Sequence, residues 1–162
     1  MAQLFMLAAD CETKEKAEKF AEFFEGKMYK LRDGLVSKVS CDVFEQDDSF
    51  WVRACPSGVS KNGGVNATDL NQFSELKKFL YDDLKNAPDF RFALVEVEAE
   101  SYNSYEGWIS DNNENMTNLP PGLVVNQELC EKIDKQEDLV PFKEKYYWFP
   151  YDYYEKKLFK RE

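Results

Sequence analysis

The feature that most constrains the fold is a run of aromatic residues near the C-terminal end of the sequence. Seven of the nine residues from Tyr146 to Tyr154 are aromatic. Aromatic side chains bury about 150–250 Å² each and dominate protein cores and interfaces. Because strand side chains alternate between two faces, one strand cannot direct all of them inward. We expect one face to pack on the domain, and the other to cover a second layer or to contact a partner.

The overall composition indicates one folded domain. The 162 residues are 43% hydrophobic and 15% aromatic, which is enough for a hydrophobic core. No apolar run approaches the length of a membrane span, and the first residues lack the basic region of a signal peptide. We therefore predict a single α+β domain over residues 1–162 and a cytoplasmic location.

The sequence contains no histidine. This excludes Ser-His-Asp and Cys-His catalytic arrangements, histidine metal ligands and the usual general base near neutral pH. The glycine pair Gly63-Gly64 is not followed by the lysine and hydroxyl residue of a phosphate-binding loop. These features predict a protein that is not an enzyme, with no catalytic residue, no metal site and no cofactor.

The first hundred residues show an ordered series of elements, marked by apolar periodicity and by turn residues. They are a strand at 3–9, a helix that Asp10 or Thr13 can cap and that ends at Gly26, a hairpin at 38–55 with its turn at 47–49, a helix that begins at Thr68 or Asp69 and stops before Pro88, and a strand at 90–98. The order β-α-β-β-α-β is that of a ferredoxin-like split βαβ unit. We therefore expect an α+β fold with a ferredoxin-like βαββαβ core at residues 1–100.

Beyond residue 100 the composition changes. Residues 101–121 are rich in Asn, Ser and Tyr and lead into Gly122, which is typical of a long loop. A short apolar run at 123–125 follows, and Asn126 is a suitable N-cap for a short helix. Together with the aromatic run, these residues predict a C-terminal loop-helix-strand extension of the core.

The four cysteines form neither a CxxC pair nor a recognisable zinc-binding spacing. They are Cys11, Cys41, Cys55 and Cys130. Thiols of a cytoplasmic protein are kept reduced, so we expect four free cysteines. Cys41 and Cys55 fall on the two arms of the expected hairpin, which predicts that they are close enough to crosslink accidentally.

The negative charge is concentrated in one part of the chain. The net charge is −10, and residues 96–138 contain eleven acids and two bases, a net charge of −9. Such a charge steers basic partners toward the protein and repels nucleic acid and anionic membranes. Tyr102, Tyr105 and Trp108 are interleaved with these acids. The combination predicts a surface for a basic protein partner, and the alternative is an acidic face that is merely solvated.

The candidate partner-binding residues combine carboxylates of this segment with aromatic residues of both regions. They are Glu96, Glu98, Tyr102, Tyr105, Trp108, Asp111, Glu114, Tyr151 and Tyr153. In such a surface the carboxylates pair with Arg and Lys of the partner, while the rings serve as anchors.

Two segments also carry a family resemblance. Residues 119–125 read Leu-Pro-Pro-Gly-Leu-Val-Val and are followed by the aromatic residues 146–151. This pattern, in a small acidic protein, resembles bacterial toxin-immunity proteins. The resemblance implies a protein that binds a cognate toxin, often a basic nuclease, and blocks its active site or its substrate surface. One alternative is a phage-type DNA mimic that inhibits a host nuclease or defence system. A second alternative is an enzyme that uses carboxylates.

Overall fold

The centre of the fold is the strand expected from the first apolar run. The computed structural model describes residues 2–3, 5–58, 61–62, 67–97, 99–101, 104–111, 120–133 and 138–150. Strand β2 (Phe5–Glu12) is buried at every position except its last. It pairs in antiparallel fashion with β5 (Ser49–Pro56) on one side and with β7 (Phe92–Val97) on the other.

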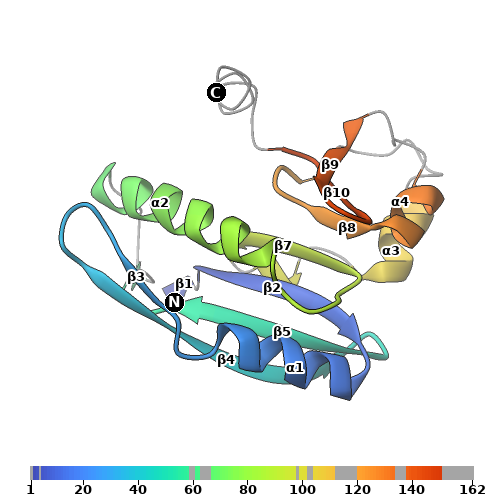
Figure 1. Cartoon of the computed structure of the whole chain (residues 1–162), viewed down its shortest axis with the longest axis horizontal. Coiled ribbons are helices and arrows are strands. Elements are labelled where there is room, and N and C mark those ends of the chain that lie inside the picture. The colour runs from blue at the N-terminus through green and yellow to red at the C-terminus, as the bar shows by residue number, and fades with distance from the viewer. Residues whose placement is uncertain are drawn as a thin grey trace.

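These strands belong to an eight-stranded sheet in which all neighbours are antiparallel (Figure 1). The other members are β3 (Met28–Lys30), β4 (Val36–Gln46), β8 (Val124–Asn126), β9 (Val140–Lys143) and β10 (Tyr146–Trp148). The strand order is β3-β4-β5-β2-β7-β8-β10-β9. A separate pairing joins β1 (Ala2–Gln3) to β6 (Lys61–Asn62). The sheet and its helices confirm the predicted α+β class.

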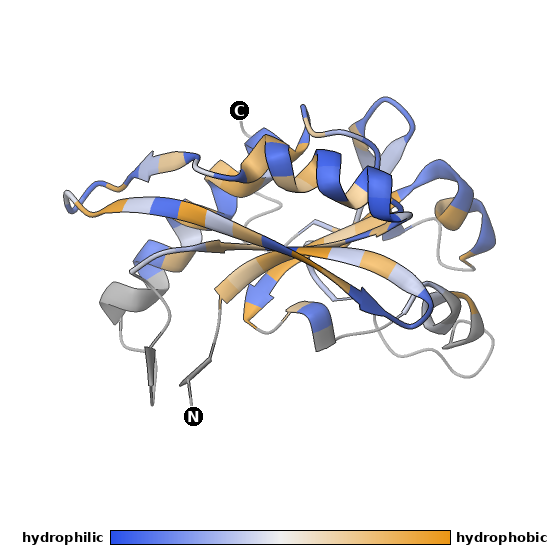
Figure 2. Ribbon diagram, turned by 90° about the horizontal axis from the view of Figure 1, so that it is seen from below, coloured by the Kyte–Doolittle hydropathy of each residue, from blue (hydrophilic) through white to orange (hydrophobic). Residues whose placement is uncertain are grey.

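Helices α1 (Lys14–Phe24) and α2 (Ala67–Leu84) cover one face of the sheet (Figure 1). Of the two expected caps, Thr13 begins α1, and its hydroxyl accepts a hydrogen bond from the Lys16 N–H at 3.2 Å. Apolar residues of both helices pack on alternate residues of β2 in the first core. They include Ala17, Phe20, Phe24, Leu76, Leu80 and Leu84, against Phe5, Leu7 and Ala9. The hydropathy colouring shows hydrophobic residues along the central strands (Figure 2).

The opposite face of the sheet carries a second core. Short elements cover it, namely η1 (Ala99–Ser101), α3 (Tyr105–Asp111) and α4 (Gln127–Lys132). Asn126 begins α4 as expected, since its side chain accepts a hydrogen bond from the Leu129 N–H at 2.8 Å. The prediction of a loop over all of 101–121 is wrong for α3. Tyr105 and Trp108, three residues apart, form a helical stripe that this core buries.

The hairpin and the crossover connections place β4, β5, β2 and β7 side by side. The hairpin turn contains Asp47 and Asp48, both with positive φ (54° and 59°), as a two-residue turn of type I′ requires. β2 and β4 run parallel with β5 between them, and α1 lies in their connection. β5 and β7 likewise run parallel on either side of β2, and α2 lies in their connection.

The aromatic run supplies β10, and its side chains alternate between the two cores. Tyr146 and Trp148 pack with the first core, while Tyr147 and Phe149 pack with the second. Tyr81 of α2 and Phe142 of β9 contact the Trp148 ring, with centroids 5.5 and 5.4 Å away. The expectation that one strand face packs on the domain and the other on a second layer is confirmed for these four residues. The run's remaining aromatic residues lie outside the described part.

The register of the hairpin separates Cys41 from Cys55. Cys41 lies opposite Ala54, whereas Cys55 lies opposite Ser40, so the two thiols point to opposite faces of the sheet. Cys41 packs with the first core and Cys55 with the second. The expectation that these cysteines could crosslink is therefore wrong. All four cysteines are free in the structure.

We predict that mild oxidation of the native protein does not join Cys41 to Cys55. Burial raises the pKa of Cys55 to about 11 and that of Cys41 to about 12, which also slows thiolate chemistry. The check is the intact mass before and after treatment, with a sample oxidised in urea as the control. A linked Cys41–Cys55 peptide from the native sample would contradict the register.

Trp108 offers a test of the second core. Its side chain is 6% exposed, its ring contacts Phe92 edge-on at 6.0 Å, and its indole N–H has no hydrogen-bond partner among the described residues. We expect Trp108→Ala to lower the free energy of unfolding by about 3–5 kcal/mol, because the substitution leaves a cavity. Trp108→Phe should cost much less, since no hydrogen bond is lost. Urea unfolding of both variants checks this, and a cost for Trp108→Phe as large as that for Trp108→Ala would contradict it.

Candidate functional site

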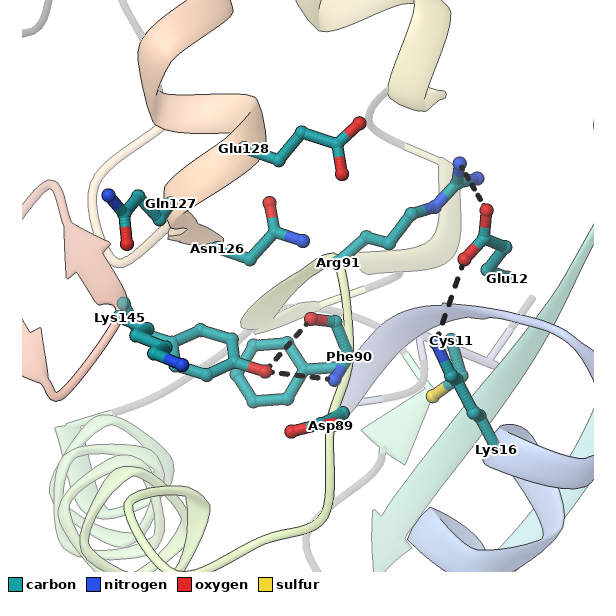
Figure 3. A pocket seen from close by; sticks show the side chains of 11 residues that line it. Cys11, Glu12, Lys16, Asp89, Phe90, Arg91, Asn126, Gln127, Glu128 and Lys145 are labelled. Atoms are coloured by element: carbon teal, nitrogen blue, oxygen red, sulfur yellow. Dashed lines mark hydrogen bonds and ion pairs between the residues drawn. The ribbon is translucent and has the colours of Figure 1, made fainter.

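A polar pocket of about 270 Å³ lies at the end of the sheet where β2 ends and β7 begins (Figure 3). Residues from three distant segments meet there, at 11–16, 89–91 and 126–128, and the turn between β9 and β10 adds a fourth side. The lining residues are Cys11, Glu12, Lys16, Asp89, Phe90, Arg91, Asn126, Gln127, Glu128, Lys145 and Tyr146. Their chemistry makes this pocket the candidate site.

A buried ion pair fixes one wall of the pocket. The Arg91 Nη2 and Nε atoms donate to the two carboxylate oxygens of Asp10 at 2.9 and 3.2 Å. Asp10 is 1% exposed, and it also accepts hydrogen bonds from the Ser49 hydroxyl at 2.5 Å and from the Glu12 N–H at 2.9 Å. Ser49 in turn accepts a bond from Arg91 at 3.1 Å. The carboxylate is therefore well satisfied, as a buried charge must be.

Tyr105 supports the Arg91 side chain from the second core. The guanidinium carbon lies 4.0 Å from the centroid of the Tyr105 ring, which is a cation–π distance. The Tyr105 hydroxyl lies 3.3 Å from a Glu128 oxygen and 3.4 Å from the Lys132 ammonium. Burial raises the pKa of Tyr105, and the hydrogen bond from Lys132 lowers the pKa of the exposed Glu128 carboxyl. Tyr105 thus connects the pocket wall to α4.

Charges of both signs surround the pocket. Glu12 lies between Arg91 and Lys16. One of its carboxylate oxygens is 3.8 Å from Arg91 Nη1, and the other is 3.8 Å from Lys16 Nζ. Glu128 and Asp89 lie on opposite sides, and Lys145 occupies a third side (Figure 3). This arrangement is suited to recognising a charged polar group that enters from outside.

The two remaining reactive groups of the pocket are held by the fold. Burial raises the pKa of the Cys11 thiol far above its ordinary value, so the thiol is protonated at neutral pH. The Tyr146 hydroxyl donates to the Phe90 carbonyl at 3.1 Å and accepts from the Phe90 N–H at 3.2 Å. Among the described residues, no group of three or more Cys, Asp or Glu side chains is arranged to hold a metal ion.

The structure describes three of the predicted partner-binding side chains. Tyr105 and Trp108 are buried in the second core, so neither is the exposed anchor that was expected, and Tyr105 lies directly behind the pocket. Glu96 is half-buried and forms an ion pair with Lys77 of α2 at 3.3 Å. Asp111 ends α3, but its side chain is not described. The others, Glu98, Tyr102, Glu114, Tyr151 and Tyr153, lie outside the described residues.

Sequence reasoning missed most of the pocket. Asp10 appeared only as a possible helix cap, and Arg91 as an ordinary member of a strand. In both cases the sequence showed a charged residue next to strongly apolar residues. Asp10 directly follows the apolar run 3–9, and Arg91 lies between Phe90 and Phe92. Charged side chains in buried strands need partners, and these two neutralise each other.

Comparison with protein-family models, curated proteins and solved structures found no match to this chain. Within its described residues, none of the helices combines the length and the apolar character that crossing a membrane requires. The chemistry of the site itself therefore has to indicate the function.

We predict that Arg91 and Asp10 are strongly coupled. Arg91→Met should lower the free energy of unfolding by about 3–5 kcal/mol, because it leaves the Asp10 carboxylate buried without its cation. The double variant Asp10→Asn with Arg91→Met should cost less than the sum of the two single variants, since it removes both charges. Urea unfolding of the three variants measures this coupling, and additive costs would argue against it.

Proposed function

We propose that this chain is a binding protein that engages a basic protein partner, and that it acts as an immunity or inhibitor protein against a toxin. The supporting observation is that exposed carboxylates from separate segments converge at one end of the sheet. Glu12 of β2, Asp89 of the loop before β7 and Glu128 of α4 line the pocket from three different segments. Asp47 and Asp48 lie in the adjoining hairpin turn, next to Ser49 of the Asp10–Arg91 network.

The pocket suits the end of an arginine or lysine side chain from the partner. A guanidinium or ammonium group entering it has Asp89 on one side and Glu128 on the other (Figure 3). Glu12 is less available, because Lys16 and Arg91 already flank it. Desolvated hydrogen bonds between charged groups of this kind are among the stronger contacts at protein interfaces.

The acidic segment 96–138 contributes to this site through α4. Glu128 and Glu131 are exposed on α4, while Leu129 and Cys130 are buried beneath them. In the proposed interface, Tyr105 and Trp108 act from below as rigid supports of this layer. The carboxylates above them steer the partner and set its association rate.

We also propose that the core is of the ferredoxin-like kind. Support comes from the element order and from the two parallel strand pairs, β2 with β4 and β5 with β7, each separated by one antiparallel strand. β3 and the strands β8, β10 and β9 extend this unit at both ends.

The test is capture of partners from the native host, followed by rate measurements on the purified pair. We expect a basic partner whose association slows by about tenfold or more at low salt when Asp89 and Glu128 are both reversed to lysine. At 1 M salt, where the Debye length is about 3 Å, the difference should largely disappear. Stopped-flow fluorescence measures both conditions.

The matched control is the reversal of Glu18 and Glu22, two exposed acids of α1, to lysine. It changes the net charge by the same amount at another surface. If the control slows association equally, net charge rather than the pocket is responsible, and the site assignment is wrong. Capture of acidic partners would contradict the proposal. If the chain instead competes with DNA for a nuclease and the pocket residues do not contact that nuclease, the protein is a DNA mimic and the proposal fails.

A further inference from the structure

The β3 edge of the sheet differs in charge from the rest of the molecule. β3 is the last strand on its side of the eight-stranded sheet. Residues 27–32, which contain it, read Lys-Met-Tyr-Lys-Leu-Arg and carry three bases and no acid, in a chain of net charge −10. Lys38, directly opposite Met28 on β4, adds another base. An acidic protein thus has a basic sheet edge.

The hydrogen bonds of the β3–β4 ladder show which backbone groups face this edge. Val39 donates to the Lys27 carbonyl at 2.8 Å, and Leu31 donates to the Leu35 carbonyl at 2.8 Å. Because bonded and non-bonded pairs alternate in an antiparallel ladder, the pairs at Met28 and Lys30 are non-bonded ones. The N–H and C=O groups of Met28 and Lys30 therefore point away from β4, toward the open side.

Apolar side chains accompany these backbone groups. Met28 is 64% exposed and Val36 is 47% exposed, and both lie on the same face of the two-strand ladder. Lys30 and Lys38 complete this face, so the exposed apolar pair has a lysine on either side. Short strands and lysines normally protect a sheet edge from pairing, but exposed Met and Val side chains do not serve that purpose.

The other face of β3 holds the edge in place. The Tyr29 hydroxyl donates to an Asp83 carboxylate oxygen of α2 at 2.6 Å. The Tyr29 ring stacks on Phe79 with centroids 5.1 Å apart and planes inclined by 5°. β3 is therefore fixed before any partner arrives, which reduces the entropic cost of binding.

The two edges of the sheet differ in their capacity to pair. The opposite edge strand, β9, contains Pro141, which has no N–H to donate. No proline lies in β3 or in the residues around it from 27 to 32. Strand addition is therefore favoured at the β3 edge.

We propose that the β3 edge binds an extended acidic segment of another protein by strand addition. The outward backbone groups of Met28 and Lys30 would bond to the added strand, Met28 and Val36 would contact its apolar side chains, and Lys30 and Lys38 would pair with its carboxylates. A second copy of this chain is a poor occupant, because pairing of two β3 strands would bring Lys27, Lys30 and Arg32 of both copies together. This surface is separate from the candidate pocket, where three acids (Glu12, Asp89 and Glu128) lie beside three bases (Lys16, Arg91 and Lys145).

The test uses an acetylated and amidated peptide with a repeated Glu-Val sequence, and a Lys-Val peptide as the control. The measurement is amide NMR of the full chain during the titration. We expect saturable binding of the acidic peptide only, with the largest shifts and slowed amide exchange at Met28 and Lys30. Lys30→Glu combined with Lys38→Glu should weaken binding by about tenfold or more. Met28→Ser should weaken it without altering its salt dependence.

The control variant is Lys14→Glu combined with Lys19→Glu on α1, which changes the charge equally and leaves the edge intact. Equal loss of binding in this control, shifts centred elsewhere, or no saturation up to about 1 mM peptide would each overturn the proposal. Dimerisation through β3, measured by sedimentation without peptide, would assign the edge to a second copy instead. Preferential binding of an oligonucleotide would also overturn it.

Discussion

The pair of Asp10 and Arg91 is the interaction on which most of the structure depends. It joins the end of β2 to the start of β7, and Ser49 brings β5 into the same network. A one-residue slip of β2 against β7 would turn the carboxylate to the other face and leave the buried Asp10 charge without its cation. The pair therefore specifies register in the middle of the sheet. Through the Tyr105 ring it also fixes where the second layer sits.

The sequence was most informative where one periodicity ran over many residues. The apolar stripe of α1 and the alternation in β4 reflect burial of mainly one face, whereas the unbroken apolar run of β7 reflects burial on both faces, so local pattern and final environment agree. Thr13 and Asn126 were recognisable as caps because their hydrogen bonds are to residues only three positions away. The aromatic run indicated two layers because the side chains of a strand point to both faces of the sheet, and a single layer can cover only one of them.

The site could not be predicted in the same way, because its residues come from separate segments. Asp89, Glu128 and Lys145 become neighbours only after β7, β8 and β10 have paired. Tyr105 and Trp108 were misleading for a different reason. Aromatic residues within an acidic, Asn-rich segment look like exposed anchors, yet a helix of seven residues is enough to turn both toward a core. β3 has only three residues, too few for any periodicity to mark it.

The position of β2 has a consequence for biosynthesis. Its side chains serve both cores in alternation, Leu7 and Ala9 on one side and Met6 and Ala8 on the other. Yet Ala9 pairs with Val52 and with Ala93, which are made much later. At about 5–20 residues per second, a ribosome needs roughly 4–17 s to travel from the first of these strands to the last. During that time a mostly apolar strand has no partner on one edge, which makes the nascent chain a natural client for chaperones that shield exposed strands.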